Sequence, residues 1–284
     1  MGSQLGNVVF IIWRESVEAL LVIGILSAWL THQGAGVGRA KVYLWSGVAA
    51  GLVAAVLLGW ALVAFGDSLP EEAQQAYQAT VVLVAAALIV QMVMWMRRHG
   101  RTLKRDLESS LSEAAARSSW WGVFVLALIA VAREGSETAI FLYGTLSAGS
   151  GAGVLALVGA AALGFALALA TFFLLQLGGR VLSWRVFFRI TEVMLLFLAA
   201  ALLMTGVGIL IDMDVLPRLT GKLWDTSWIL SDGGTVGGMV SALTGYRARP
   251  VGIEALAFIA YWVVVLWLLS TPRSLAARSA RPAA

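Results

Sequence analysis

The chain has 284 residues, of which 60% are hydrophobic and only 13% are charged. This composition is too apolar for a soluble globular domain. The absence of cysteine from the sequence excludes disulfides, thiolate zinc sites and iron–sulfur clusters. The formal net charge of +4 is explained by basic loops beside a membrane. We therefore expect a lipid bilayer, and no nucleic acid, as a partner.

Apolar runs long enough to cross a bilayer occupy more than half of the chain. A membrane-spanning helix needs about 20 mostly apolar residues. Seven runs of about this length lie at residues 7–30, 43–66, 79–96, 120–147, 152–176, 190–211 and 252–270. We expect an all-α membrane protein with seven transmembrane helices, residues 1–284 forming a single transmembrane domain. The first run carries three charges and follows a leader without Lys or Arg, so we expect it to be retained rather than cleaved.

The distribution of Lys and Arg predicts how these spans are oriented, because cytoplasmic loops are enriched in both residues. With the N-terminus outside, fourteen of the 20 Lys and Arg residues lie on the inner side and four on the outer side. The other two lie inside predicted spans. We expect a multi-pass protein of the plasma membrane, which in a bacterium is the inner membrane, with its C-terminus in the cytoplasm.

The first predicted span contains three charged residues, Arg14, Glu15 and Glu18. A charged side chain at the bilayer centre costs about 2.5–3.5 kcal/mol on insertion scales, so such residues usually have a function. Positions i and i+3 share one face of a helix. Glu15 and Glu18 therefore point the same way, and Arg14 lies one turn from Glu18, within reach of an i,i+4 ion pair.

The fourth predicted span repeats the pattern with Arg133, Glu134 and Glu137, 119 residues after the first copy. The first span enters the membrane from outside and the fourth from inside. This predicts an inverted repeat of three plus three helices, residues 7–96 and 120–211, followed by an outer loop at 212–250 and a last helix at 252–270. Transporters of this design place the substrate site near the midplane, between the repeats.

Four carboxylates and two guanidiniums facing each other would carry a formal charge of −2, which favours a bound cation. Carboxylate oxygens are hard ligands, so a ferric ion fits best, although ferrous iron, manganese, magnesium and calcium suit the same oxygens. We expect Glu15, Glu18, Glu134 and Glu137 to hold the metal. The supporting residues in and beside the motifs are Arg14, Arg133, Ser16, Ser136 and Thr138. Thr138 would add its hydroxyl as a further oxygen ligand.

Three other interpretations of the charged motifs are an enzyme, a structural pair of ion pairs and a transporter of another cation. A di-iron carboxylate enzyme requires Glu-x-x-His motifs, and no predicted span contains a histidine, so we expect no enzyme and no organic cofactor. Two buried ion pairs that lock the helices would leave Glu15 and Glu134 unpaired at a cost. A proton-coupled transporter or exchanger of another hard cation or an organic cation stays as the alternative to iron transport.

Several polar or small residues outside the motifs carry further expectations. In the glycine-rich outer loop, Asp225 and Asp232 would either capture a cation or stabilise turns of short helices. Glu192 would pair with Arg189 or lie on the exit path, and Glu254 would cap the last helix. The inner loop 97–119 is predicted to form an amphipathic helix. Four glycines are expected to allow close helix packing: Gly47, Gly51, Gly159 and Gly164.

The doubled Arg-Glu-x-x-Glu motif in the first and fourth of seven helices resembles the high-affinity iron permeases, which include fungal oxidase-coupled permeases and bacterial ferrous or ferric permeases. That family usually has Arg-Glu-Gly-Leu-Glu, so Gly135 follows the pattern and Ser16 departs from it. Residues 93–97 and the outer stretch 224–250 also look familial. The resemblance covers nearly the full chain.

This resemblance implies iron uptake across the plasma membrane, with iron as the transported substrate. The four glutamates would carry the iron, and Arg14 and Arg133 would tune their charge. It also implies a separate extracytoplasmic protein that binds or oxidises iron, so that ferric iron reaches the permease.

Overall fold

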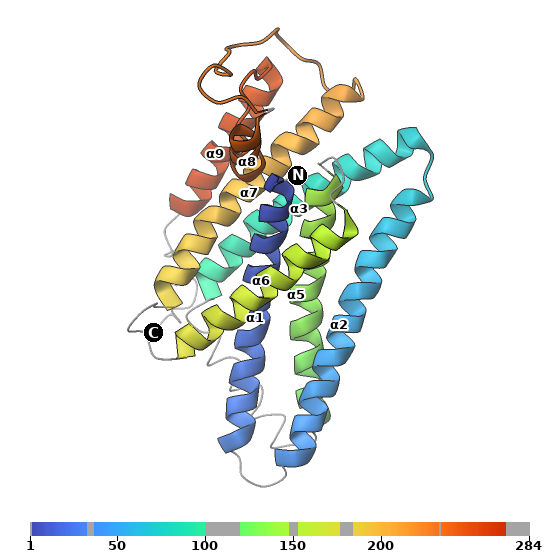
Figure 1. Cartoon of the computed structure of the whole chain (residues 1–284), viewed down its shortest axis with the longest axis vertical. Helices are drawn as coiled ribbons and strands as arrows, with labels where there is room; N and C mark the ends of the chain where they lie inside the picture. Colours follow the sequence, from blue (N-terminus) through green and yellow to red (C-terminus); the bar gives the residue numbers. More distant parts are fainter. Residues whose placement is uncertain are drawn as a thin grey trace, which may run out of the picture.

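The structure is a computed structural model that describes residues 2–32, 37–99, 120–147, 153–176, 184–232 and 234–270. These residues form helices and one isolated antiparallel bridge between Lys222 and Val251. The helices in Figure 1 are α1 (Gly2–His32), α2 (Val37–Asp67), α3 (Glu71–His99), α5 (Trp121–Ser147), α6 (Val154–Gln176), α7 (Trp184–Asp212), α8 (Thr235–Thr244) and α9 (Gly252–Ser270). The all-α class expected from the sequence is confirmed.

Five of the described helices, α2, α3, α6, α7 and α9, are long and apolar enough to cross a membrane. Helices α1 and α5 are of similar length, with 31 and 27 residues. Each carries an Arg and two Glu within its length, and these charges rather than length set them apart from the other five. Together with its apolar composition, the helix set makes this chain a multi-pass membrane protein.

The apolar helices differ in how much of their surface other helices cover. In the most apolar stretch of α7, 61% of the residues are buried, against 11% in α2 and 6% in α9. Helix α2 instead exposes large side chains such as Trp45, Val56 and Trp60. Lipid tails are as apolar as these side chains, so a bilayer covers such a surface without a protein partner. Helix α7 therefore belongs to the centre of the bundle, and α2 and α9 to its rim.

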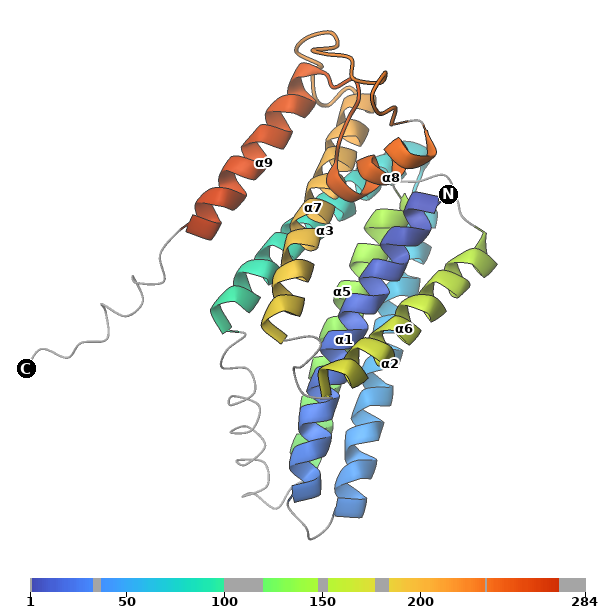
Figure 2. The ribbon, with the colours of Figure 1, turned by 60° about the vertical axis from the view of Figure 1, so that its left-hand side comes forward.

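Helices α1 and α5 lie side by side and antiparallel in the bundle (Figure 2). At one end the side-chain amide of Gln4 donates to the carbonyl of Leu146, at 3.3 Å. Toward the other end Leu30 belongs to the same buried cluster as Val123. In addition, α2 packs on α5, α6 packs on α1, and α3 packs on α7. The first helix of each predicted half thus contacts the second helix of the other half.

Small residues allow the closest of these contacts. A Cβ built on Gly51 of α2 would lie 2.8 Å from Val131 Cβ of α5, and one on Gly164 of α6 would lie 2.7 Å from the Val9 carbonyl of α1. Gly47 is equally close to α5. The expectation was wrong for Gly159, because nothing lies within 4 Å of its position. Helix approach therefore depends on three of the four glycines that the sequence singled out.

The outer segment between α7 and α9 folds through polar contacts at one end of the bundle (Figure 1). Asp225 accepts bonds from the backbone N–H and the hydroxyl of Ser227, at 3.0 and 2.5 Å, and pairs with Arg249 at 2.9 Å. Asp232 accepts from the backbone N–H of Ala248, at 3.2 Å. Helix α8 ends at Thr244, and the capping residue Gly245 has a φ of +75°, a left-handed conformation that favours glycine. Both aspartates thus hold this segment together.

Two further acids have structural partners. Glu254 accepts a bond from the backbone N–H of Val251, at 3.0 Å, so the expected cap of the last helix is confirmed. Glu192 of α7 forms its ion pair with Arg97 of α3, at 3.2 Å, and not with Arg189. The α3–α7 packing brings Arg97 close, a long-range contact that helical spacing alone does not reveal. Most of the predicted amphipathic helix, residues 100–119, lies outside the described residues.

A substitution pair within α6 tests the role of close packing. Gly164→Val should lower the thermal unfolding midpoint of the purified protein, because the added side chain meets α1, and overpacking costs about 1–3 kcal/mol. Gly159→Val introduces the same side chain into the same helix where space is open, and should leave the midpoint nearly unchanged. Equal effects of the two substitutions would contradict the packing argument.

The anchoring of Asp225 gives a pH prediction. The Ser227 hydroxyl and backbone N–H, followed by Arg249, lower the pKa of Asp225 to about 2. A lowered pKa means that these bonds stabilise the fold above the ordinary Asp pKa and lose that effect as the pH falls toward 2. Ser227→Ala should therefore raise the pKa, read from the carboxyl carbon signal in an NMR titration. Ser231→Ala is the control, and an ordinary pKa in the unsubstituted protein would refute the assignment.

Candidate metal centre

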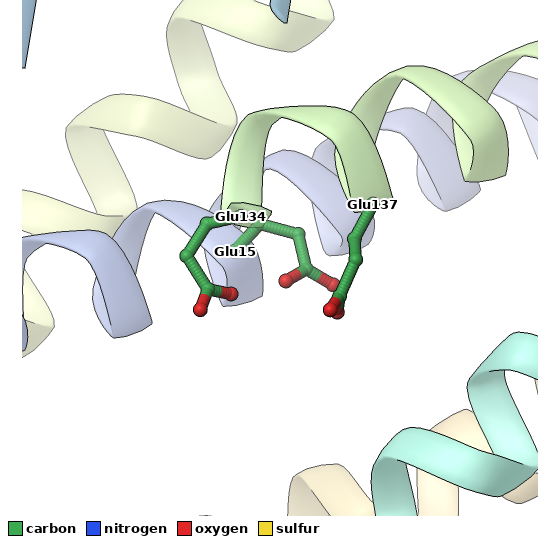
Figure 3. A group of neighbouring side chains, drawn as sticks. All are labelled: Glu15, Glu134 and Glu137. Carbon is green, nitrogen blue, oxygen red and sulfur yellow. The ribbon is translucent and has the colours of Figure 1, made fainter. Parts of the chain in front are cut away.

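Three carboxylate groups meet between α1 and α5. One oxygen from each of Glu15, Glu134 and Glu137 lies within 4.8 Å of the others. Figure 3 shows the three side chains, from two different helices, turned to the same side. Glu15 and Glu134 are buried and Glu137 is largely so. Glu15 and Glu134, which are 119 positions apart in sequence, therefore lie in one group of carboxylates.

Glu18, the fourth predicted ligand, lies outside this group of three. Its carboxylate forms an i,i+4 ion pair with Arg14, as the helical spacing indicated. The same guanidinium lies 2.6 Å from Glu15 through its Nη1 atom. Arg14 is thus shared between the two carboxylates of its own motif, and only Glu15 of that pair joins the glutamates of α5.

Arg14 is 1% exposed, and two further contacts of its guanidinium come from α3. Nη1 lies 3.4 Å from the sulfur of Met92, and Nη2 lies 3.2 Å from the sulfur of Met96. A buried guanidinium needs partners for its five N–H groups, and thioether sulfur is a weak acceptor. The Nε atom of Arg14 has no hydrogen-bond partner among the described residues. The first arginine is therefore enclosed but incompletely bonded.

The second arginine has different surroundings. Arg133 pairs with Glu137 at 3.1 Å, again in an i,i+4 pair, and its side chain is 40% exposed. Its guanidinium carbon lies 4.4 Å from the centre of the Trp95 ring, which is a cation–π contact. The two motifs are alike in sequence, yet α3 contacts one arginine with methionines and the other with an aromatic ring.

The site has buried oxygens that lack hydrogen-bond partners among the described residues. One oxygen of each of Glu15, Glu134 and Glu137 lacks a partner. Glu134 also forms no ion pair with any of the described residues. Burying a carboxylate without a partner costs several kcal/mol, by order of magnitude. Converging acidic oxygens with free lone pairs are the donor set of a cation site.

A cavity of about 520 Å³ adjoins the site on its α3 side. Glu137 and Arg133 line it from α5, so one of the three converging carboxylates borders open space. The side chains on α3 that line it are Leu88, Gln91, Met92, Met94 and Trp95. An ion could reach Glu137 from this cavity without displacing a helix.

The hydroxyl groups of the motifs bond to their own helix. Thr138 donates to the carbonyl of Glu134 at 2.8 Å, and Ser136 donates to the carbonyl of Arg133 at 2.7 Å. Ser16 is half-buried on α1. These bonds use the hydroxyl hydrogens and leave oxygen lone pairs. Asp225 and Asp232 belong to the outer segment described above and bond within it.

Sequence reasoning gave no role to Met92 or Asn7, and it noted Trp95 and Met96 only as part of the stretch 93–97 that resembles the family. The two methionines stand four residues apart, so they share one face of α3, but methionine in an apolar span is ordinary. Asn7 is buried and donates to the carbonyl of Ala242 in α8, at 3.2 Å. A lone amide in an apolar run was the only signal for it.

Comparison with known proteins assigns the chain to a family. A family model described as the iron permease FTR1 family matches residues 6–274. The chain belongs to this family. The ferrous iron permease EfeU of Shigella sonnei is 27% identical over 277 residues, which cover 96% of this chain and 98% of that relative. No solved structure matches the chain.

Two further relatives give the same picture. The ferrous iron permease EfeU of Escherichia coli O6:H1 is 28% identical over 273 residues, covering 95% of this chain and 97% of the relative. The protein of that name from Yersinia pestis is 27% identical over 278 residues, covering 96% of each chain. These FTR1 family members are named as permeases, as expected for a transporter.

Glu134 offers a sharp test of the centre. Glu134→Gln keeps the shape but removes a carboxylate oxygen, so the affinity of the purified protein for divalent iron, cobalt or manganese should fall by about 10–100-fold. The thermal midpoint should not fall, because a buried charge without a partner is removed. Isothermal titration calorimetry measures the first and circular dichroism the second. Glu254→Gln, far along the chain at the start of α9, is the control and should bind as the unsubstituted protein does.

Proposed function

We propose that this FTR1 family member is an iron permease that moves iron across the plasma membrane into the cytoplasm, through a site of Glu15, Glu18, Glu134 and Glu137. The observation that carries the proposal is the convergence of carboxylates from α1 and α5 within 4.8 Å. Iron is the substrate, and the naming of the relatives as ferrous iron permeases supports this choice.

The proposal includes seven spans, with α1 and α5 crossing the membrane despite their charges, and an inverted repeat. Helix contacts in matching register support the repeat. Gly51 of α2 meets Val131, two residues before Arg133, and Gly164 of α6 meets Ile12, two residues before Arg14. A two-fold axis in the membrane plane relates such contacts naturally. In this arrangement the N-terminus is outside and the C-terminus is cytoplasmic, with the basic segments inside.

Charge exchange is the proposed mechanism. In the empty site, Arg14 and Arg133 partly neutralise their glutamates through ion pairs. An entering iron ion brings positive charge that replaces those pairs, because several carboxylates bind a multivalent cation more strongly than a guanidinium. Rocking of one repeat against the other would then open the site inward. The neutralising arginines thus reduce the cost of the empty state.

The oxidation state and delivery of iron are part of the proposal. Carboxylate oxygens suit both ferric and ferrous iron. We predict from the sequence that a separate extracytoplasmic iron-binding or iron-oxidising protein supplies the iron in the ferric state. Capture by Asp225 and Asp232 also stays a prediction of the sequence. Their carboxylates already bond within the outer segment, so capture would compete with those bonds.

Uptake of radioactive iron into proteoliposomes tests the function. Glu15→Gln should abolish uptake, because it removes the carboxylate that pairs with Arg14 and converges with the two glutamates of α5. Glu72→Gln, exposed in the first turn of α3, is the control and should transport normally. Supplying the iron as ferric citrate or as ascorbate-reduced iron separates the two oxidation states. Normal uptake by Glu15→Gln would reject the site.

A proton-coupled transporter of another hard cation is the alternative. Competition of iron uptake by manganese, magnesium and calcium distinguishes it, since an unselective carboxylate site would accept all three. Efficient competition by magnesium or calcium at concentrations similar to iron would favour the alternative.

A further inference from the structure

The donor atoms around Arg14 form a set that resembles the ligands of a metal ion. Nη1 of the guanidinium lies between Glu15, at 2.6 Å, and the sulfur of Met92, at 3.4 Å. Nη2 lies between Glu18 and the sulfur of Met96, the latter at 3.2 Å. Each terminal nitrogen therefore faces one carboxylate and one thioether.

Packing alone gives a poor account of this arrangement. Methionine often fills irregular gaps in a core, but here both sulfurs face the same buried cation. Thioether sulfur is only a weak acceptor for N–H groups. Meanwhile Arg14 Nε lacks a hydrogen-bond partner and so does an oxygen of the buried Glu15, among the described residues. The surroundings of Arg14 thus leave its Nε–H unbonded and give Nη1 and Nη2 a weak sulfur acceptor each, while they offer two oxygen and two sulfur donors.

We infer that the position of the Arg14 guanidinium is a mixed oxygen–sulfur cation site, in which Met92 and Met96 are specificity-determining ligands beside Glu15 and Glu18. When no metal is bound, the Arg14 guanidinium occupies this position and supplies the positive charge that the two carboxylates need. The inference deepens the proposed function and depends on it for the identity of the transported ion.

The donor set defines the class of ion. Thioethers prefer soft or borderline cations, whereas magnesium, calcium and manganese prefer oxygen alone. Two sulfurs beside two carboxylates therefore favour ferrous iron over ferric iron and over these hard divalent ions. The four glutamates by themselves attract any of these cations, so in this scheme α3 supplies the discrimination between them.

The positions of the two methionines suit this role. They stand one helical turn apart on α3, and Met92 is 5% exposed. Met92 also lines the cavity that borders Glu137. A cation that entered by that cavity would meet sulfur and carboxylate donors together. Met94 lines the same cavity, but the sulfurs that contact Arg14 among the described residues are those of Met92 and Met96, so Met94 provides a matched control on the same helix.

Silver binding to the purified protein tests the site directly. Silver(I) is a soft cation that seeks sulfur, and the chain has no cysteine and eight methionines. The doubly substituted Met92→Leu/Met96→Leu protein should bind silver at least about tenfold more weakly than the unsubstituted protein. Met94→Leu should bind it normally. Leucine has nearly the same volume as methionine, so the substitutions should not disturb packing. Size-exclusion chromatography checks that each variant folds. If the double variant does not fold, Met92→Leu and Met96→Leu are measured separately.

Unchanged silver affinity in the double variant, or an equal loss in Met94→Leu, would overturn the inference. Iron uptake provides the second measurement. In the double variant the preference for ferrous iron over manganese should fall about tenfold, and an unchanged preference would overturn the specificity role. Silver binding is measured without transport, so it tests the sulfur ligands separately from the proposed function. If the protein did not transport iron, the proposed function would be rejected, and the silver affinities would still test the roles of Met92 and Met96.

Discussion

The cost of burying charge in an apolar bundle is the constraint on which this structure depends. Arg14 is almost fully enclosed, and the residues placed around it are the acids of its own motif and two sulfurs of α3. Removing any one partner would leave another buried group unpaired. Helix α1 must therefore lie where α3 and α5 can both reach it, and the bundle is arranged accordingly.

The same constraint makes the site responsive to a cation. Ion pairs within the two motifs involve Glu15, Glu18 and Glu137, while one buried oxygen of each of Glu15, Glu134 and Glu137 keeps free lone pairs. A metal ion could satisfy those oxygens together, which no side chain among the described residues does. The incomplete satisfaction of the centre is therefore consistent with a site that binds and releases its ion.

Sequence symmetry and structural asymmetry coexist in this member of the FTR1 family. The motif occurs twice, and glycines of α2 and α6 approach the two copies in the same register. Helix α3 nevertheless contacts Arg14 with methionines and Arg133 with Trp95, and the cavity adjoins only the second motif. Arg14 is thus enclosed and Arg133 accessible, although the two motifs match in sequence.

The sequence by itself determined the helical membrane class, the two charged motifs and their i,i+4 ion pairs, because apolar length and helical periodicity are local properties. It also indicated the glycines at 51 and 164, though not that Gly159 lies in open space. Only the tertiary structure decided that Glu192 pairs with Arg97, that Glu18 lies outside the group of three acids within 4.8 Å, and that Met92 and Met96 face Arg14. These contacts join different helices, and their register depends on packing that no spacing within one helix encodes.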